Sequence, residues 1–249
     1  MALAIAVLAL AAMLAVAAWW ALGREGAAAR LQPAAASDAP LLLFTSLPIY
    51  WGEAPDLASM LASKKKHWAR AAIEERRGLR PLDTLEDEAL GEERDLLMIQ
   101  PRPLSPQENV VLDAWVAAGG RLLLFADPAL TEDSAFAIGD RRRPQDVVLL
   151  SPILARWGLA LEFDEDQPLG ERGVRVGGGA SLPVNLPGRF LDRDGGRPDA
   201  NCRVDGVIAD CRIGSGRVVA IADAALFEAE DSAARRGALD AMLTRAFGR

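Results

Sequence analysis

The sequence predicts an α/β protein: a mostly parallel β-sheet flanked by helices, with a small β-hairpin annex, preceded by an N-terminal transmembrane helix. Short segments such as LLLF at 41–44 and RLLLF at 121–125 are continuously apolar, which is typical of strands that helices cover on both faces. Segments with helical periodicity alternate with these strands, as they do in parallel sheets. The predicted organisation is an anchor at 1–22, a linker at 23–39 and an α/β domain at 40–249.

Residues 2–22 predict the membrane anchor, because they contain no charged or strongly polar side chain over 21 residues. At ~1.5 Å per residue, a helix of this length can cross a hydrocarbon layer ~30 Å thick. Trp19 and Trp20 stand near its end, where amphipathic rings favour the headgroup region. The alternative is a cleaved signal peptide with Ala27–Ala29 as its small-residue site. The length of the apolar run, and the absence of a preceding Lys or Arg, favour the anchor.

Two features of the sequence disagree about the side of the membrane on which the domain lies. Arg24 and Arg30 follow the apolar segment, and the positive-inside rule would place the domain in the cytoplasm. Cys202 and Cys211 flank RVDGVIAD, whose Asp-Gly pair could form a hairpin turn that brings the thiols within reach of a disulfide. A close pair in a chain with no other Cys suits an oxidising compartment, although two unrelated buried thiols remain the alternative. We therefore expect a single-pass inner-membrane protein with an extracytoplasmic, periplasmic domain.

The first elements of the domain are predicted from apolar patterning and breakers. A strand is expected at 41–46, followed by a helix over Pro55–Arg77 that stops at Gly78. One face of this helix carries apolar side chains, namely Leu57, Met60, Leu61 and Trp68. The segment LRPLDTL at 79–85 is expected at a sheet edge, because its proline lacks the N–H that a central strand donates.

The strongest local signals predict a β-α-β unit with a right-handed crossover. Its strands are expected at 95–101 and 121–127. Ser105 is placed as N-cap of the intervening helix, with Pro106 at the first helical position and Glu108 completing a capping box. The helix is predicted to bury an apolar stripe and to end at a left-handed glycine; these residues are Val111, Leu112, Trp115, Ala118 and Gly119.

The second half of the chain shows weaker patterns. Residues 131–150 form a long charged insert, and Ser151-Pro152 is expected to cap a short helix ending at Trp157-Gly158, before a strand in LALEF. Gly-, Pro- and Asp-rich turns predict the β-hairpin annex at about 168–213. A last buried strand at 218–222 and an amphipathic C-terminal helix follow; the helix carries Leu239, Met242, Leu243, Ala246 and Phe247.

Composition excludes several classes of function. A net charge of −7 argues against a nucleic-acid partner, and the run Lys64–Trp68 is interpreted as a solvated helix face. A single histidine, His67, excludes histidine-rich metal sites, and no Gly-x-Ser-x-Gly elbow is present for a catalytic triad. GSGRVV at 214–219 lacks the third glycine of a dinucleotide loop, and no Walker sequence is found. We therefore expect no cofactor, metal or catalytic residue.

Polar residues follow four of the predicted strands: Ser46, Asp83, Asp127 and Asp223. Ligands of open α/β sheets bind at the carboxyl ends of the strands, so these residues are candidate ligand contacts. Aspartate is also a common strand-exit residue, because its carboxylate accepts backbone N–H bonds, and we favour this interpretation. Asp127, which precedes Pro128, is accordingly expected to form a non-catalytic elbow.

Two stretches of the sequence resemble a known family. DLLMIQPRPLSPQENVVLDAWVAAGGRLLLFADP (95–128) and GSGRVVAIADAALF (214–227) are similar to the auxiliary domain of uncharacterised ABC-type transport systems, the gliding-motility GldG-like group. The resemblance implies a flavodoxin-like or class I glutamine-amidotransferase-like fold without the catalytic Cys. It also implies a non-enzymatic, extracytoplasmic partner of ABC permease and ATPase subunits on separate chains. The family has no catalytic residues to carry over, and this chain differs from it in having no C-terminal apolar span and no permease region.

These observations predict a membrane-anchored accessory or binding domain of an ABC-type transport system that is not an enzyme. A carboxylate-dependent hydrolase using Asp127 and Asp223 with a divalent metal is one alternative. A purely structural envelope protein is the other.

Overall fold

The computed structural model describes residues 39–56, 58, 66–176 and 179–248. The predicted anchor at 1–22 and residues 23–38 of the predicted linker lie outside them. Within the part of the chain that the structure describes, no helix combines the length and the hydrophobicity needed to cross a bilayer.

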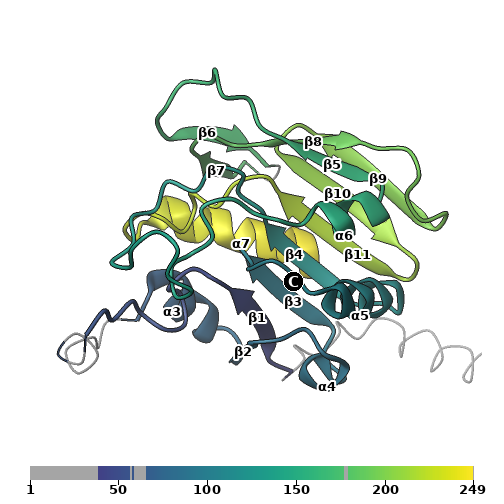
Figure 1. The fold of residues 1–249 in the computed structure, drawn as a ribbon, viewed down its shortest axis with the longest axis horizontal. Coiled ribbons are helices and arrows are strands. Elements are labelled where there is room, and N and C mark those ends of the chain that lie inside the picture. The colour runs from purple at the N-terminus through teal and green to yellow at the C-terminus, as the bar shows by residue number, and fades with distance from the viewer. Residues whose placement is uncertain (1–38, 57, 59–65, 177–178, 249) are drawn as a thin grey trace, which may run out of the picture. The chain divides into compact units, whose positions relative to one another are not determined.

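A seven-stranded sheet forms the centre of the domain, in the order β2-β1-β3-β4-β11-β10-β9 (Figure 1). Neighbouring strands from β2 to β11 are parallel, while β10 and β9 continue the sheet in antiparallel pairing. The predicted mostly parallel sheet is thus confirmed. The strands are β1 (Leu41–Thr45), β2 (Leu79–Pro81), β3 (Asp95–Ile99), β4 (Arg121–Phe125), β9 (Ala200–Asp205), β10 (Ile208–Ile213) and β11 (Gly216–Ile221).

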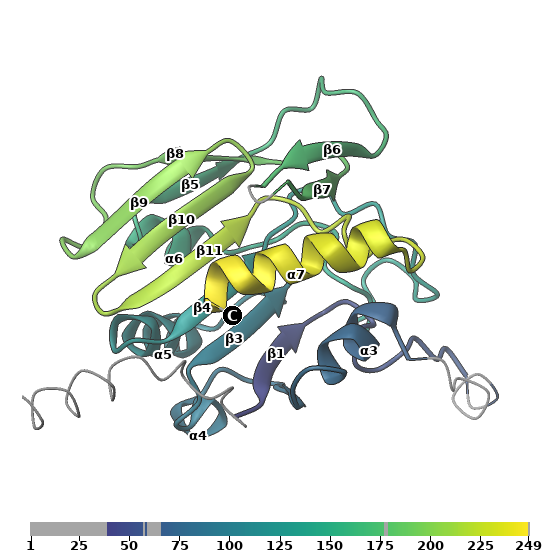
Figure 2. The ribbon, with the colours of Figure 1, turned by 180° about the vertical axis from the view of Figure 1, so that it is seen from behind.

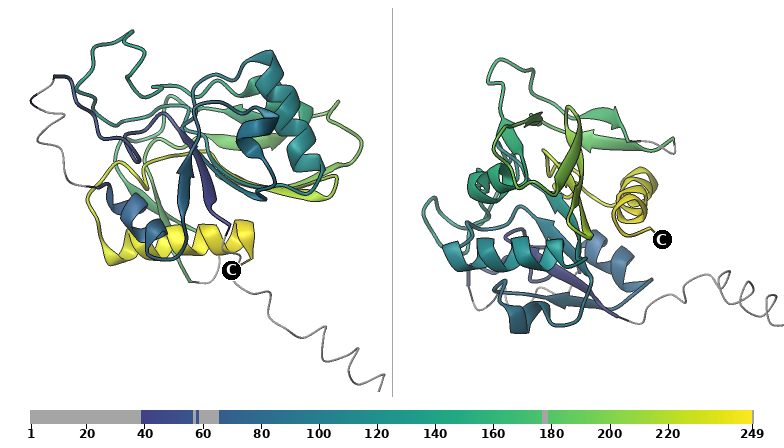
Figure 3. Two further views of the ribbon diagram at one scale, coloured as in Figure 1. Left: turned by 90° about the horizontal axis from the view of Figure 1, so that it is seen from below. Right: turned by 90° about the vertical axis from the view of Figure 1, so that its right-hand side faces the viewer.

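Helices cover both faces of this sheet, which explains the continuous hydrophobicity of its strands (Figures 2 and 3). One hydrophobic core joins the sheet to α3 (Trp68–Glu74) and α7 (Ala233–Phe247). The core on the other face joins it to α4 (Asp87–Leu90), α5 (Pro106–Ala117) and α6 (Ser151–Arg156). Alternate residues of β3 and β4 point to opposite cores, so the four apolar residues of β3 are all buried.

The predicted β3-α5-β4 unit is confirmed, and its capping box has the expected geometry. Ser105 Oγ accepts a hydrogen bond from Glu108 N (3.1 Å), and a Glu108 carboxylate oxygen accepts one from Ser105 N (2.8 Å). Glu108 also accepts bonds from Leu85 N (3.1 Å) and from the Arg102 guanidinium (2.7 and 2.9 Å). Arg102, and then the backbone donors, hold the pKa of this buried carboxylate at about 2. One side chain therefore joins the start of α5 to the chain that follows β2.

The helix predicted over Pro55–Arg77 is wrong in its extent. Residues 52–56 are irregular, Ala58 is helical, and the non-helical residues 66–67 precede α3, which begins at Trp68 and ends at Glu74. His67 has an extended backbone (ψ 140°), and its Nδ1 accepts a hydrogen bond from Ala69 N (3.1 Å), which starts the helix at this point. His67 therefore caps a helix rather than lying on a solvated helix face. Leu57, Met60, Leu61, Lys64 and Lys65 lie outside the described residues.

Two predicted helix ends also differ. Ser151 does not cap α6: Leu150 is the N-cap, without a side-chain hydrogen bond, and Ser151 is the first helical residue. Ala118, which was predicted to be buried, is exposed at the end of α5. Val116 is the last residue of the buried stripe instead. Gly119 follows with φ 113°, a backbone conformation that L side chains rarely adopt.

The strands of residues 168–213 divide among three sheets. β6 (Arg172–Arg175) and β7 (Ser181–Val184) form a separate hairpin, and β8 (Arg189–Asp192) pairs with β5 (Leu159–Glu162). β9 and β10 belong to the central sheet instead.

The hairpin between β9 and β10 contains the two cysteines. It turns through Gly206 (φ 57°) and Val207, which sets Cys202 directly opposite Cys211. The structure joins the two residues by a disulfide, on the face of the sheet that packs against Trp157 and Phe190.

We predict that the Glu108 contacts stabilise the domain more than the Ser105 cap does. Glu108→Gln places an amide N–H₂ against existing donors and should lower the free energy of unfolding by about 2–3 kcal/mol. Ser105→Ala should lower it by about 1 kcal/mol. Denaturant unfolding at neutral pH measures both, with Gln107→Ala, an exposed position on the same helix, as the neutral control. A smaller loss for Glu108→Gln than for Ser105→Ala would contradict this account.

Candidate functional site

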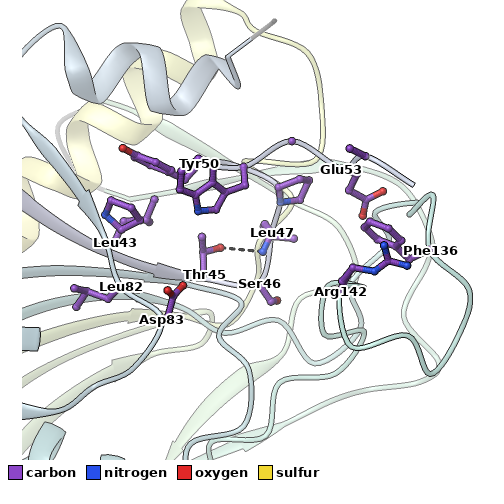
Figure 4. A pocket seen from close by; sticks show the side chains of 15 residues that line it. Leu43, Thr45, Ser46, Leu47, Tyr50, Glu53, Leu82, Asp83, Phe136 and Arg142 are labelled. Atoms are coloured by element: carbon purple, nitrogen blue, oxygen red, sulfur yellow. Dashed lines mark hydrogen bonds between the residues drawn. The ribbon is translucent and has the colours of Figure 1, made fainter. Parts of the chain in front are cut away.

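The four predicted rim residues fall into two groups. Ser46 and Asp83 line a cleft of about 450 Å³ at the carboxyl ends of β1 and β2 (Figure 4). Asp127 and Asp223 do not line this cleft, and both are fully buried. Both groups lie at the carboxyl edge of the sheet, but Ser46 and Asp83 line an open cleft whereas Asp127 and Asp223 are enclosed.

Three segments of the chain build the cleft. The end of β1 and residues 46–54 form one wall, and Pro81–Asp83 at the end of β2 form the second. Phe136 and Arg142, from the irregular insert at 131–150, form the third. The cleft lies beside the point where strand order reverses, because the chain leaves β1 outward to β2 and then crosses back to β3. Open α/β sheets bind ligands at such a point.

Polar side chains attach the insert to the first wall of the cleft. Glu53 accepts hydrogen bonds from Ser134 Oγ and from Ala135 N, both at 2.6 Å. Ser46 Oγ donates to the carbonyl oxygen of Gln100 and accepts from Gln145 N (3.1 Å). The long insert is therefore a structural wall of the cleft, and the Ser46 hydroxyl is occupied by backbone partners.

Aromatic side chains and a stacked guanidinium group line the cleft. Trp51 is 71% exposed and packs edge-on against Tyr50, with ring centroids 4.8 Å apart. The Arg70 guanidinium stacks on the other ring of this pair, Tyr50, at 3.9 Å, and its Nη1 donates to the Tyr50 carbonyl oxygen (2.7 Å). Arg142 stacks on Phe136 at 4.2 Å. Asp83 has an exposed side chain across the cleft from Arg142 in Figure 4. Large exposed rings beside charged groups are typical of binding surfaces.

Asp127 and Asp223 use both carboxylate oxygens to hold the backbone. Asp127 accepts bonds from Ala129 N (2.8 Å) and Ala224 N (2.9 Å). Asp223 accepts bonds from Ala225 N (2.7 Å) and Asn185 N (2.8 Å). These contacts fix the exits of β4 and β11 and join them to each other and to the end of β7. This is the capping role that the sequence favoured for strand-exit aspartates.

Burial nevertheless raises the pKa of both carboxyl groups well above the usual value for aspartate. It raises the pKa of Asp127 to about 7, against the effect of its two backbone donors. Burial, and next the neighbouring charge of Asp127, raise the pKa of Asp223 to about 8. Glu132 behaves similarly: burial, then the charges of Glu228, Glu53 and Asp133, raise its pKa to about 7.

Within the part of the chain that the structure describes, His67 and the strand-exit aspartates are held in structural hydrogen bonds. Among the described residues, no group of three or more His, Cys, Asp or Glu is placed to hold a metal ion. His67 Nδ1 accepts from Ala69 N, so its Nε2 donates to the Phe227 carbonyl oxygen (3.1 Å), and burial lowers the pKa of the ring. Both ring nitrogens are thus engaged in structural bonds.

The sequence analysis missed Gln100, the residue that organises this edge of the sheet. Its side chain is buried, donating to the carbonyl oxygens of Asp127 (3.0 Å) and Gln145 (2.7 Å) and accepting from Asp127 N (2.8 Å). Its backbone has φ 41°, a conformation rare for a non-glycine residue. The available signal was a lone amide between an apolar strand and Pro101.

No protein-family model matches the sequence, and a search of curated proteins finds no match. Solved structures resemble it only distantly. The exo-β-1,4-mannosidase from Opitutaceae bacterium strain TAV5 is 14% identical, with a TM-score of 0.48 over 84% of this chain and 36% of that chain. The β-galactosidase from Rahnella sp. R3 is 13% identical, with a TM-score of 0.46 over 83% and 31%. A ThuA-like protein from Bacteroides uniformis ATCC 8492 is 11% identical, with a TM-score of 0.39 over 87% and 97%.

This chain spans about a third of the length of the two glycosidases. At these identities and scores, the likenesses carry no argument about activity.

The raised pKa values predict that the domain becomes less stable as pH rises. The folded state retains protons on Asp127 and Asp223 up to about pH 7 and 8, whereas the unfolded chain releases them near 3.8. The free energy of unfolding should therefore fall between pH 5 and pH 8, by at most about 1.4 kcal/mol per pH unit for each group. Denaturant unfolding across this window should show a flatter profile in the Asp127→Asn/Asp223→Asn double variant. Glu132→Gln should remove part of the remaining slope. An equal slope in wild type and double variant would contradict the assignment.

Proposed function

We propose that residues 39–249 form a non-catalytic binding domain whose cleft at the ends of β1 and β2 holds a segment of a partner protein. The domain would serve an ABC-type transport system, with permease and ATPase subunits on separate chains. In this proposal residues 1–22 anchor it in the inner membrane and the domain is extracytoplasmic. The observation that carries the binding role is the separation of the open cleft from the enclosed carboxylates.

Occupied polar groups favour binding over catalysis. The Ser46 hydroxyl bonds to the backbone. The carboxyl groups of the two buried strand-exit aspartates, Asp127 and Asp223, do the same. A nucleophile needs an adjacent base, and the single histidine is engaged at both nitrogens. The side chains of the cleft that are open to solvent include Trp51, Asp83 and Arg142, which suit recognition rather than attack.

The shape of the cleft supports a polypeptide as its occupant. Three chain segments border it, and Trp51, one of its lining residues, is largely exposed. Ile138, in the insert that forms the third wall, is 88% exposed. An exposed aromatic side chain in an open cleft, with a further exposed aliphatic side chain elsewhere in the insert, is typical of protein interfaces.

The transport role and the finer fold assignment rest on other support. The five parallel strands follow the order 2-1-3-4-5 of flavodoxin-like sheets when renumbered along the chain, in line with the flavodoxin-like or amidotransferase-like fold implied by the resemblance. The GldG-like stretches at 95–128 and 214–227 coincide with β3-α5-β4 and β11. The 21-residue apolar segment and the Cys202–Cys211 disulfide support a membrane-anchored domain in an oxidising compartment.

Site-specific photocrosslinking in native membranes tests the partner. A photoreactive phenylalanine analogue at Trp51 should crosslink the full chain to a permease subunit of a transporter. The same analogue at Leu169, which is 79% exposed and outside the cleft, should give no such product. Absence of an integral membrane protein among the products at position 51 would remove the transport role. Equal yields at both positions would remove the cleft as its site.

One observation favours the alternative of a carboxylate-dependent hydrolase. Asp127 and Asp223 have pKa values raised to about 7 and 8, and enzymes use such perturbed carboxyl groups for general acid–base chemistry. Enclosure of both groups beneath their backbone donors argues against this role, because a substrate atom must come within hydrogen-bonding distance.

Single substitutions separate the two functions. Asp127→Asn and Asp223→Asn should leave the yield of the Trp51 crosslink and the bound divalent metal content unchanged, once each is corrected for the folded fraction. Elemental analysis and quantified crosslinking provide these measurements, with Asp164→Asn, an exposed loop position, as the matched control. Loss of bound metal in both variants but not in the control would favour the hydrolase.

A further inference from the structure

The antiparallel end of the central sheet has an open polar face. On the α7 side, α7 crosses β4 and β11 and contacts β10 through the Arg245–Asp210 pair (3.5 Å), while no helix of the described residues lies over β9 (Figure 2). A hollow of about 480 Å³ lies on this face, at the amino ends of β4 and β11. The cleft of the proposed function lies at carboxyl ends, so the two sites are independent.

Arginines dominate the lining of this hollow in a chain whose net charge is −7. They come from four strands, with one carboxylate among them: Arg121, Arg203, Arg212, Arg217 and Asp210. The hydroxyl of Ser215 adds a neutral donor at the border. A concentration of guanidinium groups at one place on an acidic protein creates a local positive potential that attracts anions.

Two of these arginines are held in position by other parts of the domain. Arg217 makes a two-point contact with Asp210 (3.0 and 2.6 Å). Arg121 donates to Asp95 (2.7 Å) and to the Phe247 carbonyl oxygen (2.6 Å). Partial burial by itself would raise the pKa of Asp210, but its arginine neighbours hold that pKa below the usual value. The floor of the hollow is therefore a fixed set of ion pairs.

The other two arginines have no such partner among the residues that the structure describes. Arg203 and Arg212 are exposed; Arg203 stands directly opposite Asp210 in the β9–β10 ladder, but the Asp210 carboxylate bonds to Arg217 and Arg245 instead. Arg212 also stands directly opposite Arg217 in the β10–β11 ladder, and Asp210, the nearest acid in that ladder, is engaged by Arg217. Like charges facing each other across strands destabilise a sheet, so the arrangement is unfavourable unless an anion joins them.

We propose that this hollow binds a phosphate-bearing anion through Arg203 and Arg212, supported by Arg121 and Arg217. The planar guanidinium presents paired N–H donors that match phosphate oxygens, which is why arginine predominates in phosphate sites. The ligand is either a soluble phosphate compound or the headgroup of an anionic phospholipid. The two sources share the same recognition chemistry.

Arginine-selective modification of the full chain in neutral phosphatidylcholine vesicles tests the site and distinguishes the sources. Phenylglyoxal modification of each arginine is followed by mass spectrometry. Added inorganic pyrophosphate should slow modification at Arg203 and Arg212 if the ligand is soluble. Vesicles that contain phosphatidylglycerol should slow it, with pyrophosphate having no effect, if the ligand is a headgroup. Arg141 and Arg193, which are exposed and outside the hollow, should react at unchanged rates in every condition. Unchanged rates at Arg203 and Arg212 with both probes overturn the proposal.

A charge-matched pair of variants excludes a general electrostatic effect. Arg203→Gln/Arg212→Gln should weaken binding of the protecting probe by about tenfold or more. Arg141→Gln/Arg193→Gln, which removes the same charge elsewhere, should leave it unchanged. The first variant should also melt at the same or a higher temperature than wild type, because it removes the unfavourable Arg212–Arg217 pair. Equal weakening by the two double variants would overturn the proposal, whereas the expected difference supports it.

Discussion

The hydrogen bonds around Gln100 and Asp127 determine how the carboxyl edge of the sheet is closed. The Gln100 amide bonds to both the N–H and the carbonyl of Asp127, and the Asp127 carboxylate reaches Ala224 N beyond β11. Strands β3, β4 and β11 are therefore joined where they end, in a region from which water is excluded. Buried polar groups of this kind are stabilising only when every partner is present, so this small network depends on the positions of all three strands.

Because the ends of β4 and β11 are closed, the open cleft lies at the ends of β1 and β2. With β4 and β11 sealed by their own aspartates, the space at the carboxyl ends lies over β1 and β2, where the insert at 131–150 contributes a wall. Ser46 belongs to both regions, since it bonds to the Gln100 carbonyl oxygen and supports Gln145 of the insert. The same network that encloses the carboxylates thus positions the insert against the cleft. The hydrogen-bond network around Gln100 and Asp127 therefore accounts for both the enclosed carboxyl groups and the position of the open cleft.

The domain also has a distinct chemical character at each end of its sheet. The carboxyl end combines aromatic rings with acids of raised pKa, whereas the antiparallel extension at the other end gathers arginines on an uncovered face. The disulfide lies on the opposite face of that extension and joins β9 to β10 across a direct pair. This covalent link holds Arg203 and Arg212 on neighbouring strands in a constant register, because side chains alternate between the faces of a strand.

The sequence by itself determined the central elements, because their signals are local. The continuous apolar runs of β1, β3, β4 and β11 indicate burial on both faces, and the capping box at Ser105 and Glu108 depends on residues three positions apart. Strand-exit aspartates were likewise recognisable from the residues before them. Only the tertiary structure decided that β9 and β10 extend the central sheet, that His67 caps the start of α3, and that Gln100 joins three strands. Each of these depends on partners far away in the chain, such as Phe227 for His67 and Asp127 for Gln100. The separation of Ser46 and Asp83 from the buried Asp127 and Asp223 has the same cause: strand order and burial, which no local pattern records, set which residues share a site.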